Sequence, residues 1–170
     1  MKTFIIAALT ADGFIAENSH QATDWTSKSD KKFFVERTKQ AGVMIMGRRT
    51  YETIGKPLPG RLNVVYTRRQ GLSLTPEKDE DLMYTSLPPA ELLADLEKKG
   101  YQEAAICGGA SIYTLFLEAG LVDTLYLTIE PKIFGQGVSL FGKKIAANLE
   151  LQEVKKLDEQ VILLAYRVKK

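Results

Sequence analysis

Cysteine and histidine are almost absent from this sequence. Its 170 residues include one cysteine, Cys107, and one histidine, His20. A single cysteine excludes an internal disulfide framework and is compatible with a reducing cytoplasm, where we expect the protein to act. A single histidine excludes a histidine-rich metal site and leaves at most one Ser-His-Asp relay open. We therefore expect no metal centre.

Long apolar runs and a strong net charge are absent as well. No apolar run approaches the roughly 18 residues of a membrane-spanning helix, and a formal charge of +2 is too small to indicate nucleic-acid binding. We expect neither a membrane nor a nucleic-acid partner. The start "MKTFIIAALTADG" superficially resembles a signal peptide, but its alternation into Asp12-Gly13 favours a buried first strand. Length and a hydrophobic content of 45% fit one globular domain, residues 1–170.

Short apolar runs alternate with helical stretches along the chain. Strands are predicted near 3–9, 42–47, 62–67, 83–86, 103–107 and 122–131, and helices near 27–41, 48–54, 88–100 and 110–120. The tail, 149–170, contains two alternating runs that indicate a hairpin. This order predicts an α/β fold, a three-layer sandwich with helices on both faces of a mixed sheet. The sheet is expected to be mostly parallel, with an antiparallel C-terminal hairpin.

The stretch "MGRRTYETIGKPLPGR" contains the first candidate anion site. Gly47 lets the backbone turn after an apolar strand, and Arg48, Arg49 and Thr50 occupy the first turn of the next helix. Backbone N–H groups, a hydroxyl and guanidinium groups then converge on one spot, as a phosphate requires. A solvated pair of arginines at a helix start explains the local pattern equally well.

Two further corners have similar chemistry. Another strand ends in Thr67, Arg68 and Arg69, which suit an additional phosphate or form an ordinary basic loop. In "ICGGAS", Gly108 and Gly109 join a strand to a helix and allow close approach of a ligand to the backbone, although they lack the full GxGxxG spacing. Three such corners together favour a large polyanionic ligand, and the candidate is a dinucleotide.

A different stretch, "DWTSKSDKKFF", suggests a substrate pocket with apolar walls and one charged anchor. Asp30 stands near a helix start, with Trp25 before it and Phe33 and Phe34 one turn later. Ser27 and Asp30 also have the spacing of a capping box, in which the carboxylate only satisfies helix N–H groups. The residues alone favour the capping interpretation.

The ordered set of motifs resembles the dihydrofolate reductase superfamily, which includes the reductase domain of the riboflavin-biosynthesis enzyme RibD. The motifs are "IAALTADGFIA", a tryptophan followed five residues later by aspartate, "MGRRTYETIGKPLPGR", "ICGGASIY" and "VDTLYLT", and they cover about residues 3–128. The resemblance implies NADPH as hydride donor and a flat nitrogen heterocycle, reduced at a C=N bond, as acceptor. It also implies that Asp30 has a raised pKa and polarises the substrate ring.

Carried over by position, the resemblance assigns roles to individual residues. It implies a catalytic role for Asp30 and Thr128. The residues implied to bind substrate are Trp25, Phe34, Ile54, Leu58 and Arg61. The residues implied to bind the cofactor are Ala8, Ile15, Gly47, Arg48, Arg49, Thr50, Thr67, Arg68, Cys107, Gly108, Gly109, Ala110, Ser111, Ile112 and Tyr113.

The acceptor is left open between two classes. The front half resembles folate enzymes, which favours dihydrofolate or a related pterin. The segment "FLEAGLVDTLYLTIEPKIFGQGVSLF" looks more like RibD, which favours 5-amino-6-(5-phosphoribosylamino)uracil, with Lys28 and Lys31 facing its phosphate. RibD-type domains often pair, so a homodimer is expected. A non-catalytic nucleotide-binding protein is the remaining alternative.

Overall fold

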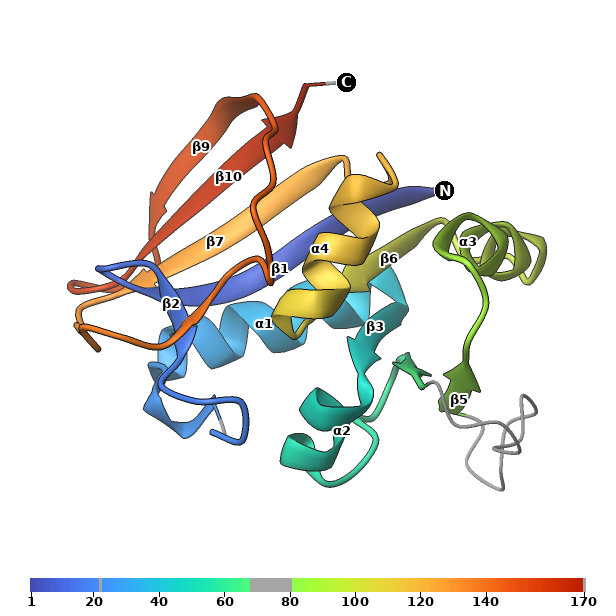
Figure 1. Cartoon of the computed structure of the whole chain (residues 1–170), viewed down its shortest axis with the longest axis horizontal. Helices are drawn as coiled ribbons and strands as arrows, with labels where there is room; N and C mark the ends of the chain where they lie inside the picture. The colour runs from blue at the N-terminus through green and yellow to red at the C-terminus, as the bar shows by residue number, and fades with distance from the viewer. Residues whose placement is uncertain (22, 68–80, 170) are drawn as a thin grey trace.

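The computed structural model describes residues 1–21, 23–67 and 81–169, which form one eight-stranded sheet in the order β5-β4-β3-β6-β1-β7-β10-β9. Its strands are β1 (Lys2–Thr10), β3 (Val43–Gly47), β4 (Leu62–Tyr66), β5 (Leu82–Thr85), β6 (Glu103–Ile106), β7 (Thr124–Glu130), β9 (Leu149–Lys156) and β10 (Ile162–Val168). All neighbours from β5 to β7 in this order are parallel, and β10 is antiparallel to both β7 and β9 (Figure 1). The predicted mixed sheet with a C-terminal hairpin is confirmed.

Helices cover both faces of this sheet. They are α1 (Lys28–Ala41), α2 (Arg48–Ile54), α3 (Pro89–Lys98) and α4 (Ala110–Glu118), with a 3₁₀ turn η1 (Thr23–Trp25) before α1. Alternating strand residues face opposite ways: Ile5 and Ile45 pack with α3 and α4, whereas Phe4, Ile6 and Met44 pack with α1. Figure 1 shows α1 and α4 on opposite sides of the central strands. The three-layer arrangement therefore follows from the two-residue period of the buried strands.

A small second sheet was not predicted. Strand β2 (Phe14–Ala16) pairs antiparallel with β8 (Val138–Ser139). Asp12 reinforces this contact by accepting hydrogen bonds from the backbone N–H groups of Phe134 and Gly135, the latter at 2.7 Å. A Cβ at Gly137 would collide with the carbonyl oxygen of Ala16, so the close approach requires glycine. The segment after β1 is thereby held against the segment after β7, beside the carboxyl ends of the central strands.

Candidate active site

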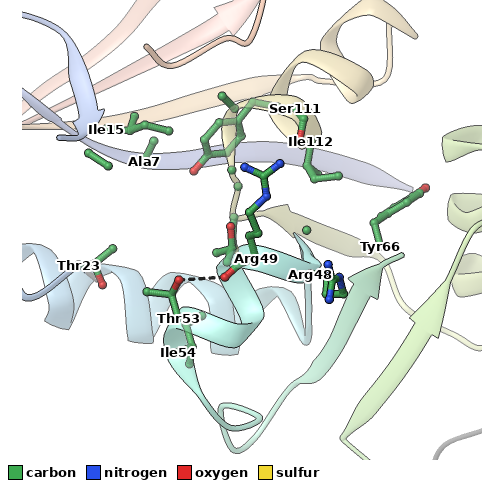
Figure 2. A pocket seen from close by; sticks show the side chains of 18 of the residues that line it. Ala7, Ile15, Thr23, Arg48, Arg49, Thr53, Ile54, Tyr66, Ser111 and Ile112 are labelled. Carbon is green, nitrogen blue, oxygen red and sulfur yellow. Dashed lines mark hydrogen bonds between the residues drawn. The ribbon is translucent and has the colours of Figure 1, made fainter. Parts of the chain in front are cut away.

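A cleft of about 1500 Å³ opens at the carboxyl ends of β1, β3, β4 and β6. Thr23 lies at one end and Tyr66 at the other (Figure 2), and Trp25, in the same 3₁₀ turn as Thr23, lines the cleft together with Phe34. Figure 2 shows Arg48 and Arg49 on α2, with Arg48 on the side of Tyr66 and Thr23 on the far side. The volume exceeds the roughly 300–1000 Å³ usual for one small ligand. The cleft therefore has room for a dinucleotide and a second molecule beside it.

Glycines bring two of the predicted corners into contact. The backbone N–H of Gly47 donates to the carbonyl oxygen of Gly108 at 2.7 Å. A Cβ at Gly47 would lie 3.2 Å from Cγ1 of Ile112, and one at Gly108 would lie 3.0 Å from the Tyr113 hydroxyl. Gly108 also has a φ of +107°, which L side chains rarely adopt. The first turns of α2 and α4 therefore face the same part of the cleft.

Two arginines follow the first corner and differ in their contacts. Nη1 of Arg48 donates to Oε1 of Glu52 at 2.8 Å in an exposed i,i+4 pair. Arg49 reaches from α2 toward the start of α4, where Ser111 lies (Figure 2). The 41% exposed Arg48 side chain and its partner lie near solvent. Arg49 is thus the better placed of the two to meet an anion between α2 and α4.

Most of the predicted site residues line this one cleft. They are Trp25, Phe34, Ile54, Leu58, Ala8, Ile15, Gly47, Arg48, Arg49, Thr50, Thr67, Cys107, Gly108, Gly109, Ala110, Ser111, Ile112 and Tyr113. Asp30, Thr128 and Arg61 are buried and are not among the residues that line the cleft. Lys31 lines the cleft, whereas Lys28 is exposed outside it. Arg68 lies outside the described residues.

Asp30 is held in the first turn of α1, and its side chain is buried. Its backbone N–H donates to Oγ of Ser27 at 3.1 Å, so Ser27 caps the helix as predicted. The reciprocal half of the capping box is different: the N–H of Ser27 donates to Oε1 of Glu130 at 3.0 Å. The interpretation of Asp30 as the capping carboxylate is therefore wrong, because Glu130 occupies that role.

The surroundings of Asp30 favour its protonated form. Burial raises the pKa of Asp30, and the nearby charge of Glu130 acts in the same direction. The hydroxyls of Thr26 and Thr128 and the ammonium of Lys31 partly oppose this effect. Oγ1 of Thr128 is close enough to influence the carboxyl but has no hydrogen-bond partner of ordinary geometry in the described part of the chain.

Arg61 is 4% exposed and packs against α1. Its Nη1 donates to the carbonyl oxygen of Val35 at 3.2 Å and to the hydroxyl of Thr38. Its Nε is buried without a partner among residues 1–21, 23–67 and 81–169. Leaving a buried polar group unpaired costs about 1–3 kcal/mol. One edge of the guanidinium is therefore held by the protein and the other has hydrogen-bonding capacity left.

The sequence did not single out two functional candidates, Tyr66 and Glu130. Tyr66 lines the cleft, and its buried hydroxyl has no partner in the described ranges. Both residues sit at the ends of predicted strands, where they are hard to distinguish from strand residues. The one sequence signal for Glu130 is an acidic residue inside the mostly apolar run "VDTLYLTIEP".

Three further observations concern the single thiol, potential metal ligands and helix length. Burial raises the pKa of the Cys107 thiol far above neutrality, so the thiolate needed by a nucleophilic cysteine is scarce. No group of three potential metal-ligating side chains occurs within the described ranges. Within the same ranges, no helix combines the length and apolar character needed to cross a bilayer.

Comparisons with known proteins agree with this geometry. Dihydrofolate reductase type 3 of Salmonella typhimurium is 36% identical over 129 residues, which cover 73% of this chain and 68% of that protein. RibD of Acinetobacter baumannii has a TM-score of 0.84 at 20% identity, covering 99% of this chain and 58% of that chain. Dihydrofolate reductase from Enterococcus faecalis, complexed with NADP(H), has a TM-score of 0.73 at 24% identity and covers 99% and 97%. The dihydrofolate reductase family profile matches residues 2–158, so the chain belongs to that family and is a reductase of its superfamily.

Proposed function

We propose that this chain is an NADPH-dependent reductase that acts on a C=N bond of a pterin-type heterocycle. The observation that carries the proposal is one cleft with two chemically different ends. Arginines and hydroxyls gather around the glycine corners at one end. Trp25 and Phe34 line the other, and the buried acid Asp30 lies one helical turn before Phe34 on α1. Such a cleft suits a polyanionic dinucleotide beside a flat, nearly uncharged ring.

The residues of the first end fit a phosphorylated dinucleotide. Arg48, Arg49 and Thr50 would hold its phosphates, and Thr67 would face the 2′-phosphate that distinguishes NADPH. Helix α4 begins in the same region, so its first N–H groups and the positive end of its dipole lie there. When bound there, the reduced nicotinamide would supply the hydride that the C=N carbon receives. Ala8 and Ile15 give the apolar wall that such a ring needs.

At the second end, the proton is handled by Asp30. Its raised pKa lets the carboxyl hold a proton closer to neutral pH than an exposed aspartate does. That proton can polarise the substrate ring and reach the ring nitrogen through water. The Thr128 hydroxyl, which acts on the Asp30 carboxyl, would bind the same edge of the ring. Phe34 and Trp25 would exclude bulk water from it.

The two candidate acceptors differ in the anionic group that each carries. A folate carries a carboxylate, and Arg61, whose buried Nε has no partner in the described ranges, would bind it. The alternative, 5-amino-6-(5-phosphoribosylamino)uracil, carries a phosphate. Lys31 supports this second acceptor because it lines the cleft, where its Nζ donates to the backbone carbonyl of Asp24 at 3.4 Å.

One assay separates these functions. NADPH oxidation is followed with dihydrofolate and with the ribosylaminouracil phosphate in parallel, and NADPH binding is measured by quenching of Trp25, the single tryptophan. We expect quenching by NADPH at lower concentration than by NADH, and oxidation with dihydrofolate. Oxidation only with the uracil derivative would assign the alternative substrate. Quenching without turnover of either compound would favour a non-catalytic nucleotide-binding protein.

We also propose that two copies pair through the outer face of the C-terminal hairpin. Leu149, Leu151 and Val154 are 39%, 52% and 60% exposed on the edge strand β9. Leu151 lies opposite Tyr166 and Val154 opposite Leu164, so the apolar residues share one face. A second copy would bury this face. Light scattering should give a dimer mass for the wild type and a monomer mass for V154K.

A further inference from the structure

Glu130 is a buried acid at the end of β7 and has no role in the function proposed above. It is 2% exposed, and β7 pairs with β1 so that Glu130 lies opposite Thr10. Oε1 of Glu130 accepts two hydrogen bonds from Ser27, from the backbone N–H at 3.0 Å and from the hydroxyl at 2.8 Å. Burying a carboxylate costs free energy unless it is hydrogen-bonded, so a carboxylate this buried is expected to have a specific structural or functional role.

The contact joins β7 to the first turn of α1. Thr128 and Glu130 are two residues apart on β7, so their side chains leave the strand on the same side. Thr128 acts on the Asp30 carboxyl, while Glu130 binds the residue that caps Asp30's own N–H. One strand therefore contacts the acid directly and also fixes the backbone that carries it.

We propose that Glu130 is a positioning residue: by binding Ser27 in place of Asp30, it leaves the Asp30 carboxyl free to face Thr128 and the substrate. A capping box would otherwise turn the Asp30 carboxylate back onto the N–H of Ser27. The inference rests on the proposed function, because it gives Asp30 its task there. Glu130 binds Ser27 and Asp30 faces the substrate, two roles that a single acid at this helix start cannot have at once.

The charge of Glu130 adds an electrostatic consequence. Like charges near one another disfavour the ionised form, and Glu130 raises the pKa of Asp30. Lys31 on α1 opposes it, and Tyr113 on α4 lies near enough to be affected by the Asp30 charge. Asp158, in the turn between β9 and β10, is linked to the same helix start through Ser29 at 2.5 Å. Removing the Glu130 charge should therefore lower the pKa of Asp30.

The experiment titrates Asp30 directly. Protein labelled with ¹³C at the aspartate carboxyl carbons is followed by NMR from pH 3 to 9, and D30N identifies the Asp30 signal. In E130Q, which keeps an oxygen acceptor for Ser27, we expect the Asp30 midpoint to move to lower pH. In E153Q, a matched change of an exposed glutamate on β9, the midpoint should stay at the wild-type value. Equal midpoints in wild type and E130Q would overturn the electrostatic part.

The second variant tests the positioning part. E130D keeps the charge but shortens the side chain, so it should lose the Ser27 contact while Asp30 still titrates at raised pH. We expect E130D to lower kcat by about threefold to tenfold, part of the general-acid contribution, with little change in KM. An unchanged kcat in E130D would overturn the proposal. The NMR titration requires no substrate, so a shifted midpoint in a protein that reduces neither acceptor would contradict the proposed function alone.

Discussion

The two ends of the cleft are built in different ways. At the end proposed for the dinucleotide, called the dinucleotide end below, short contiguous segments supply most of the lining: residues 47–50 and 108–111 each pass from a strand into a helix, and one hydrogen bond of 2.7 Å joins them. At the end proposed for the substrate, the acid on α1 is influenced by the hydroxyl of Thr128 and the charge of Glu130, both from β7, more than ninety residues later in the chain. The first end is a set of local motifs, and the second is an assembly of the tertiary structure.

The largest expected effect comes from the assembled end. D30N removes the proton-holding carboxyl while keeping its size, so turnover should fall by about 10²-fold or more, the usual contribution of a general acid. The Kd for NADPH, measured by Trp25 quenching, should stay within about twofold, because the dinucleotide end is separate. D24N, at an exposed acid on the rim of the same cleft, is the control. Near-wild-type turnover in D30N would remove Asp30 from the reaction.

Substitutions at the dinucleotide end should change the Kd for NADPH rather than the pH dependence of turnover. R49A removes a guanidinium that reaches between α2 and α4, and the Kd for NADPH should rise by about tenfold, as for loss of one charged hydrogen bond. R48A should have a smaller effect, because Arg48 is paired with Glu52 near solvent. The pH dependence of turnover should be unchanged in both. A larger effect of R48A than of R49A in the quenching titration would contradict this ranking.

Stability should reveal the cost of the buried acid. The pKa of Asp30 is raised above its ordinary value of 3.8, so the native state binds more protons than the unfolded state between the two pKa values. Asp30 therefore supports folding fully below the unfolded pKa, and this support is lost as pH rises through the folded pKa. D30N should gain stability relative to wild type between pH 4 and pH 8.

Thermal unfolding across this pH range measures the difference. The melting temperature of D30N minus that of wild type should be more positive at pH 8 than at pH 4. D158N is the control: the pKa of this exposed acid is lowered from 3.8 by Ser29 and by backbone N–H groups, so its contribution is lost only at lower pH, and the difference between D158N and wild type should change little between pH 4 and pH 8. A difference for D30N that does not vary with pH would mean that Asp30 titrates alike in both states.

The contrast between the two ends explains what the sequence could predict. The sheet, the hairpin and the Ser27 cap follow from local periodicity and capping chemistry, and they are confirmed. The glycine corners could be predicted, because Gly47 and Gly108 are needed where backbone and side chains approach closely. The capping role of Glu130 could not be predicted, because the residue that binds Ser27 comes from a distant strand. The β2–β8 pair was missed for the same reason, since its strands are too short to have a pattern.

The smallest expected effect concerns Tyr66, at the far dinucleotide end. Burial raises the pKa of its hydroxyl, which stays protonated, and the hydroxyl has no partner in the described ranges. Removing an unpaired buried polar group is neutral or slightly stabilising, so Y66F should raise the free energy of unfolding by about 0–1 kcal/mol. T38V is the contrast, because the Thr38 hydroxyl donates to Phe34 O at 2.6 Å and accepts from Arg61. Urea unfolding should show T38V destabilised by about 1–3 kcal/mol. A lower affinity of Y66F for NADPH without a loss of stability would mean that the Tyr66 hydroxyl binds the ligand. The dinucleotide end would then extend beyond its local motifs to the end of β4.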